Sequence, residues 1–129
     1  MATRGTMVIG DTSLATSREM TAAFGDQGIQ VLATCQDGIA LVEAVLEHKP
    51  DVVALDLVLP KLTGLQAIAT LKRKGANPTF VVASAVSARE RVMAAKEAGA
   101  SYYILKPLDS SALGGLAARV VDRFLTAVG

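Results

Sequence analysis

The sequence has few of the features that would suggest binding to nucleic acid, insertion in a membrane or export to an oxidising compartment. It contains no tryptophan and only 4% aromatic residues, so stacking on single-stranded nucleic acid is not expected. Its single cysteine, Cys35, excludes an internal disulfide and is typical of a reducing cytoplasm. No apolar run approaches the roughly 20 residues of a membrane span. The net charge of +1 gives no bias towards DNA or anionic lipid. We therefore expect a cytoplasmic protein without direct nucleic acid or membrane binding.

The composition is that of one compact domain. The chain has 129 residues, of which 51% are hydrophobic and 19% charged, and this is enough apolar surface to form a core. No linker, repeat or low-complexity segment interrupts it. We expect residues 1–129 to form a single domain, with any output domain outside this chain.

Short apolar runs alternate with segments of helical periodicity along the whole sequence. The predicted strands are residues 6–10, 29–33, 51–56, 79–83 and 101–105, and the predicted helices are residues 13–24, 39–48, 65–74, 87–98 and 110–128. Five strand–helix pairs imply right-handed crossovers and a parallel sheet with helices on both faces. The sequence therefore predicts an α/β fold with a doubly wound, five-stranded parallel sheet.

The apolar positions of these segments also predict which side chains are buried. In the first two helices we expect Leu14, Met20, Phe24 and a stripe that starts at Ile39 to face the core. In the fourth helix we expect Val92 and Met93 to do so, and we expect one of Tyr102 and Tyr103 to be buried and the other to lie near the surface. Gly114 and Gly115 should weaken the first turns of the last helix, because glycine is a poor helix former.

The stretch from Asp51 to Gly64 organises the rest of the chain. Four apolar residues lead to Asp56, and Pro60 soon afterwards prevents the strand from continuing. Thr63 is suited to cap the helix that follows. An acid is costly to bury within a strand, so Asp56 is predicted at the carboxyl end of a central strand, where open α/β sheets bind ligands.

Four of the five predicted strands end in a single polar residue: Asp11, Asp56, Ser84 and Lys106. Because the carboxyl ends of parallel strands share one edge, these side chains should converge there. Oxygen donors without imidazole or thiolate suit Mg²⁺. Lys106 and Ser84 could contact phosphoryl oxygens, and Asp56 could act as a nucleophile that forms an acyl phosphate. The predicted site is a phosphoryl-accepting aspartate, and a cis peptide bond between Lys106 and Pro107 is plausible.

These segments resemble the receiver domain of two-component response regulators over nearly the whole chain. The resemblance is carried by IGDTS after the first strand, by Asp56 with Pro60 and Gly64 behind it, by Ser84-Ala85, and by GASYYILKP at residues 99–107. Within the family, ASYYILKP and the apolar neighbours of Asp56 are most similar to receivers of the sporulation-regulator type. The resemblance implies the flavodoxin-like strand order 2-1-3-4-5, with two helices on one face and three on the other.

The resemblance also implies a role for each site residue. Asp56 would be the phosphorylation site, with Asp11, Asp56 and the backbone carbonyl of Val58 as Mg²⁺ ligands. Ser84 and Lys106 would hold the phosphoryl group, and Ser84, Tyr103 and Pro107 would form the switch. The phosphoryl donor would be a histidine kinase or a phosphotransferase. The face made by residues 87–98, 101–105 and 109–128 would bind a partner or a second copy of the chain.

Two features of the sequence bear on how well such a site would work. The family usually has two adjacent acids after the first strand, whereas here the first of them is replaced by Gly10, and this should weaken Mg²⁺ binding. Val58 and Val86 flank the expected site and have no polar group to orient a hydrolytic water. We therefore expect the phosphoryl group on Asp56 to be hydrolysed slowly.

Three functions remain open on the sequence alone. The first is a phosphorylation-controlled binding module that is not an enzyme beyond its own phosphorylation and dephosphorylation. The second is a phosphorylation-independent interaction domain, or pseudo-receiver, whose metal site is weakened by Gly10. The third is a small phosphatase with Asp56 as nucleophile, but such enzymes usually need a second acid two residues later, where this chain has Val58.

Overall fold

The computed structural model describes residues 3–128, and the side chains as far as residue 123. Within this range five strands and five helices alternate. The strands are β1 (Gly5–Gly10), β2 (Ile29–Cys35), β3 (Val52–Leu55), β4 (Thr79–Ser84) and β5 (Ala100–Leu105). The helices are α1 (Leu14–Gly25), α2 (Gly38–His48), α3 (Gly64–Arg73), α4 (Arg89–Ala98) and α5 (Ser110–Val128). None of the helices in the described part of the chain is long and apolar enough to cross a membrane.

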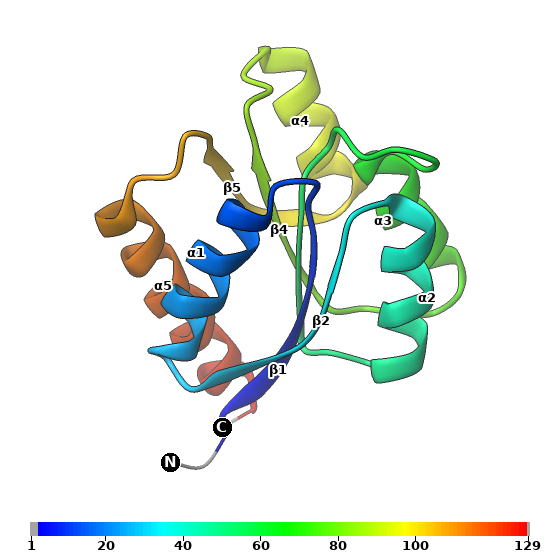
Figure 1. The fold of residues 1–129 in the computed structure, drawn as a ribbon. Coiled ribbons are helices and arrows are strands. Elements are labelled where there is room, and N and C mark those ends of the chain that lie inside the picture. Colours follow the sequence, from blue (N-terminus) through cyan, green and yellow to red (C-terminus); the bar gives the residue numbers. More distant parts are fainter. Residues whose placement is uncertain (1–2, 129) are drawn as a thin grey trace.

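The strands form one parallel sheet in the order β2-β1-β3-β4-β5. Helices α1 and α5 cover one face, and α2, α3 and α4 cover the other (Figure 1). The predicted doubly wound α/β fold and its strand order are therefore confirmed. All carboxyl ends of the strands lie along one edge, and the order reverses at β1 and β3, so the ends of these two strands border the usual ligand crevice of such sheets.

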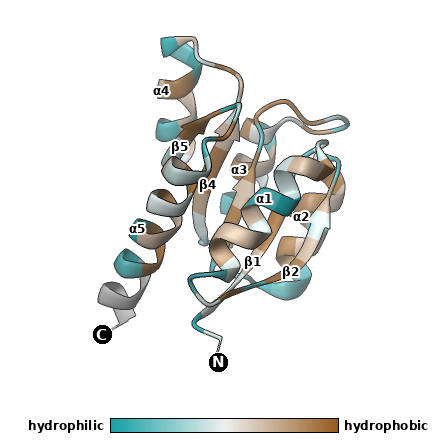
Figure 2. Cartoon of the chain, turned by 60° about the vertical axis from the view of Figure 1, so that its left-hand side comes forward, coloured by the Kyte–Doolittle hydropathy of each residue, from teal (hydrophilic) through white to brown (hydrophobic). Residues whose placement is uncertain are grey.

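The core consists of two layers, one on each side of the sheet. Val8 of β1 faces the layer beneath α2 and α3, whereas its neighbours Met7 and Ile9 face the layer beneath α1 and α5. Every residue of β3 is buried, as expected for the central strand of a parallel sheet. Figure 2 shows largely hydrophobic residues in the strands and a mixture of hydrophobic and hydrophilic residues in the surrounding helices.

Local sequence signals account for several of the helix ends. Thr63 caps α3 as predicted, and its hydroxyl accepts a hydrogen bond from the Gln66 amide while the Gln66 side chain accepts one from the Thr63 amide. Gly99 ends α4 with a φ of 129°, a conformation that favours glycine. The Asp109 carboxylate accepts a hydrogen bond from the amide of Ser111 at the start of α5, and α5 continues through Gly114 and Gly115.

Some predictions of burial were wrong. Met93 is 46% exposed and Leu14 is 55% exposed, and Ile39 is exposed as well. Leu14 and Ile39 lie on the solvent side of the first turns of α1 and α2, whereas Thr16 and Leu41 in the same turns are buried. Helix α4 begins two residues later than predicted, and of its residues only Ala95 is fully buried.

The two tyrosines of β5 also differ from the prediction. Tyr102 and Tyr103 are both partly buried, one against each layer of the core. The reason is that β5 is an edge strand with a neighbouring strand on one side only. The helices on each face of the sheet therefore cover it incompletely. The other edge strand, β2, extends two residues further than predicted, to Cys35.

Candidate functional site

Three of the four predicted site residues meet at the carboxyl edge of the sheet. The Lys106 ammonium lies 2.8 Å from Oδ2 of Asp11 and 2.8 Å from Oδ2 of Asp56. The side chains of Asp11, Asp56 and Lys106 are only 3%, 11% and 17% exposed. The lysine therefore bridges two almost buried carboxylates that come from different strands.

The sheet itself sets the position of each of these residues. The Asp56 amide donates to the carbonyl of Gly10 at 3.0 Å, and the Asp11 amide donates to the carbonyl of Cys35 at 2.9 Å. The Lys106 amide donates to the carbonyl of Ser84 at 3.0 Å. Each residue directly follows its strand and continues the backbone ladder by one hydrogen bond, so its side chain is held at the edge of the sheet.

The second oxygen of each carboxylate is held by the chain that follows it. Oδ1 of Asp11 accepts from the Ser13 amide at 2.9 Å, and Oδ1 of Asp56 accepts from the Val58 amide at 3.0 Å. Local turns of this kind orient an Asp side chain without any further tertiary contact. Both carboxylates are therefore fixed by one backbone N–H and by the shared ammonium of Lys106.

The charge of the cluster acts on the protonation of Lys106. Burial by itself lowers the pKa of this ammonium, but hydrogen bonds to Asp11 and Asp56 and the charges of both carboxylates outweigh it. The pKa of Lys106 consequently lies above its ordinary value. At neutral pH the lysine is therefore a cation that offsets part of the negative charge of Asp11 and Asp56.

Ser84, the fourth predicted residue, is completely buried at the end of β4. Its Oγ accepts a hydrogen bond from the Val86 amide at 3.2 Å. Tyr103 donates its hydroxyl to the carbonyl of Val86. Ser84 and Tyr103 are thus joined through Val86, in the loop after β4.

The environment of Tyr103 links it to the carboxylate cluster. Burial raises the pKa of its hydroxyl, the side chain of Ser84 lowers it, and the charge of Asp56 raises it, with a net increase. The pair Lys106-Pro107 next to this strand has a cis peptide bond. Pro107 itself is exposed.

The donor set is suited to Mg²⁺ although it is small. Asp11 and Asp56 present hard oxygen ligands towards a common point, and Mg²⁺ characteristically takes one or two carboxylates and keeps several waters. Among the described residues no group of three or more His, Cys, Asp or Glu could hold a metal ion. A bound Mg²⁺ would therefore rely on the two carboxylates, a backbone carbonyl such as that of Val58, and water.

Ser13 and Leu41 also lie next to the site, which the sequence pattern had not indicated. Ser13 caps α1 and donates its amide to Asp11, and the Asp-x-Ser spacing was a local signal that could have shown this. Leu41 packs over Gly10, a contact between α2 and β1 that no local pattern encodes.

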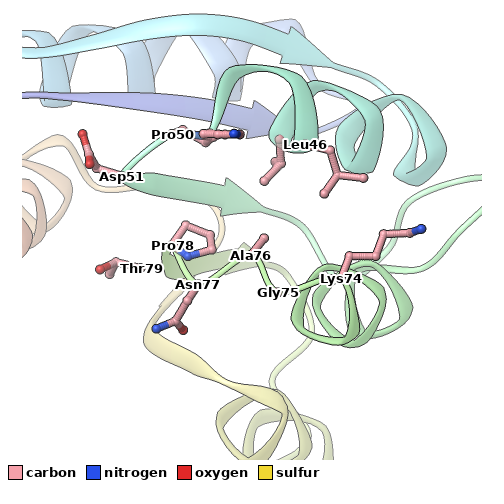
Figure 3. A pocket seen from close by; sticks show the side chains of 11 residues that line it. Leu46, Pro50, Asp51, Lys74, Gly75, Ala76, Asn77, Pro78 and Thr79 are labelled. Atoms are coloured by element: carbon pink, nitrogen blue, oxygen red, sulfur yellow. The ribbon is translucent and has the colours of Figure 1, made fainter.

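A second hollow lies at the opposite edge of the sheet, where β3 and β4 begin (Figure 3). Its volume is about 540 Å³, and it is lined by residues that include Leu46, Pro50, Ala76 and Pro78. None of the predicted site residues lines it. This hollow is therefore separate from the edge that carries Asp11, Asp56 and Lys106.

Comparison with known proteins identifies the family. The family model of the response regulator receiver domain matches residues 7–117, so this chain belongs to that family. Receiver domains are the phosphoacceptor modules of two-component signalling.

Individual relatives agree with this assignment. The chemotaxis protein CheY of Bacillus subtilis (strain 168) is 32% identical over 83 residues, which is 64% of this chain and 69% of CheY. The protein-glutamate methylesterase/protein-glutamine glutaminase 5 of Myxococcus xanthus (strain DK1622) is 34% identical over 126 residues, which is 95% of this chain but 36% of that protein. The solved REC domain of AraT, a response regulator from Geobacillus stearothermophilus, has a TM-score of 0.87 at 22% identity and covers 97% of this chain and 98% of its own.

Proposed function

We propose that this chain is a phosphorylation-controlled binding module in which Asp56 accepts the phosphoryl group. The observation that carries the proposal is the shared contact of Lys106 with Asp56 and Asp11, 2.8 Å from each carboxylate. In the reaction, an oxygen of Asp56 forms a bond to phosphorus while the bond from phosphorus to the donor breaks. The donor leaves with the electron pair of that bond, and Asp56 becomes an acyl phosphate.

The residues around Asp56 have distinct parts in this reaction. The Lys106 ammonium, already in contact with Asp56, can stay with a phosphoryl oxygen and balance part of its charge. The Ser84 hydroxyl can donate to a second phosphoryl oxygen. When bound by Asp11, Asp56 and the Val58 carbonyl, Mg²⁺ supplies further positive charge next to the phosphoryl group.

The contacts of Ser84 suggest how the phosphoryl group changes a distant surface. Ser84 accepts from the Val86 amide, and Tyr103 donates to the Val86 carbonyl. A phosphoryl oxygen that takes the Ser84 hydroxyl as donor draws Ser84, and with it the contact to Val86, towards Asp56. We propose that the ring of Tyr103, Pro107 and the loop after β4 respond together, and that they alter the face of α4, β5 and α5.

Exposed apolar side chains support the proposed partner surfaces. Leu14, Val58 and Leu105 are exposed close to Asp11, Asp56 and Lys106 in the sequence, and exposed apolar groups around a polar site favour protein contact. We propose that a histidine kinase or phosphotransferase docks there. Met93 is exposed on the face of α4 and α5. This supports a partner surface on that face, whose occupant would be a partner protein, a second copy of the chain or an output domain.

A pseudo-receiver that acts without phosphorylation is the alternative. It is favoured by the small donor set, since among the described residues Asp11 and Asp56 are the only acids in contact with Lys106, and Gly10 adds none. The cluster of Asp11, Asp56 and Lys106 would then be a structural ion pair network.

The experiment that separates these functions is intact-mass measurement after incubation with acetyl phosphate. The wild type and Asp56→Asn would each be incubated with Mg²⁺ and with EDTA. A gain of one phosphoryl group that requires both Mg²⁺ and Asp56 is expected. No gain in the wild type at millimolar Mg²⁺ would refute the phosphoacceptor function and support the pseudo-receiver.

A further inference from the structure

We infer that Leu41, in the first turn of α2, excludes an acidic side chain from position 10 and in this way limits the Mg²⁺ affinity of the site, because it occupies the space that such a side chain would need. The inference rests on the proposed function, since it concerns a metal held by Asp11 and Asp56. It gives a part in metal affinity to a residue that is not itself a metal ligand.

The geometry at Gly10 leaves no room for a side chain. A Cβ atom built on Gly10 would lie 2.7 Å from Cδ2 and 3.0 Å from Cδ1 of Leu41. Leu41 is itself completely buried in the core, so its methyl groups cannot move into solvent. The backbone of Gly10 does not have a positive φ. Packing against Leu41, rather than backbone conformation, is therefore what requires glycine here.

The charge of the site explains why this packing matters for a metal. Asp11 and Asp56 carry two negative charges, and Lys106 between them carries one positive charge, so the cluster has one net negative charge. Gly10 directly precedes Asp11, so an acid there would place a third carboxylate next to the cluster and double its net charge. Affinity for hard divalent cations rises with the number of charged ligands and neighbours, so the exclusion of an acid from position 10 by Leu41 keeps the site a weak one.

The effects of substitutions at positions 10 and 41 should therefore depend on each other. Gly10→Asp alone should fold less stably and gain little in Mg²⁺ affinity, because the new carboxylate is forced against the Leu41 methyl groups. Leu41→Ala alone should lower Tm, by on the order of 10 °C, and leave Mg²⁺ affinity unchanged. Together the two changes should raise Mg²⁺ affinity at least about tenfold and lower Tm by less than the sum of the single effects.

The experiment is isothermal titration with MgCl₂ and a thermal melt for the wild type, the two single variants and the double variant. Gly10→Asn combined with Leu41→Ala is the matched control, because it has nearly the same shape without the charge, and its Mg²⁺ affinity should equal that of the wild type. If Leu41→Ala does not fold, Leu41→Val is used in both backgrounds and should give a smaller effect of the same sign.

Two results would overturn the inference. If Gly10→Asp alone bound Mg²⁺ as tightly as the double variant and melted like the wild type, Leu41 would not restrict position 10. If the double variant bound Mg²⁺ no better than the asparagine control, the missing carboxylate would not limit affinity. Acetyl phosphate labelling of the wild type is scored separately, and its absence would refute the proposed function while these ratios of Mg²⁺ affinity would still stand.

Discussion

In the wild type the Lys106 ammonium bridges the carboxylates of Asp11 and Asp56 and compensates their mutual repulsion. After replacement of Lys106 by methionine the two carboxylates should repel each other without compensation. Methionine keeps an unbranched apolar stem of similar shape but has no charge. The two oxygens that contact the ammonium are each 2.8 Å from it. They are therefore no more than about 5.6 Å apart, and at an effective dielectric constant of about 20 two unit charges at this distance repel by about 3 kcal/mol.

The size of this effect can be compared with the stability of the domain. A cost of about 3 kcal/mol is a large part of the 5–15 kcal/mol that is typical of native proteins. In a domain of this length it should lower Tm by roughly 10 °C when divalent cations are removed with EDTA. Millimolar Mg²⁺ should return more stability to Lys106→Met than to the wild type, because in the variant no ammonium competes with the cation for the carboxylates.

The assay is thermal unfolding followed by circular dichroism, at pH 7, in EDTA and in MgCl₂. Lys96→Met is a suitable control because Lys96 is an exposed lysine of α4, and its replacement should change stability by less than about 0.5 kcal/mol. Equal Tm values for Lys106→Met and the wild type in EDTA would show that the carboxylates do not repel strongly, and our description of the site would be wrong.

Four further predictions concern single positions. Gly115→Ala should stabilise the protein by about 0.5–1 kcal/mol. Gly115 is exposed on α5, and a Cβ atom added to it would have no neighbouring atom within 4 Å. A decrease in Tm would contradict this. Gly64→Ala should destabilise by at least about 1–3 kcal/mol, because its Cβ would lie 2.4 Å from the Asp56 carbonyl oxygen, and urea unfolding measures this. The pKa of Tyr103 is raised, so its contribution to stability is present below pH 10 and is lost as the pH rises through the folded-state pKa. Tyr103→Phe should therefore reduce the loss of stability at alkaline pH. An unchanged dependence of stability on pH would contradict the assignment. Val86→Glu should shorten the lifetime of the phosphorylated protein by supplying a group that orients water, as followed by intact mass over time, whereas an unchanged lifetime would refute the role of apolar flanking residues.

The order of the elements could be predicted because each depends on neighbouring residues in the sequence. The buried run from Val52 to Leu55 and the capping box of Thr63 are local patterns with physical causes that act within a few residues. The alternation of such patterns then implied a parallel sheet, and with it a common edge for the strand ends. The positions of Asp11, Asp56 and Lys106 at this edge followed from the same argument.

The errors arose where burial depends on which side of a helix faces the sheet. Leu14 and Ile39 have helical spacing, but both side chains are exposed, whereas Thr16 and Leu41 in the same first turns are buried. Met93 lies on a helix that contacts the core mainly through Ala95. A hydrophobic period identifies a helix face, but it does not show how much of that face is covered.

The sequence alone determined the sheet, its edge and the residue types at that edge, because each follows from local hydrophobic patterns and from the geometry of parallel strands. The tertiary structure decided the distances. Lys106 is 50 residues from Asp56 in sequence, and only the packing of β5 beside β4 and of β4 beside β3 brings it to 2.8 Å from both carboxylates. The contact of Leu41 with Gly10 likewise exists only because α2 lies across β1. Such long-range contacts depend on how whole elements dock, and no neighbouring residues encode them.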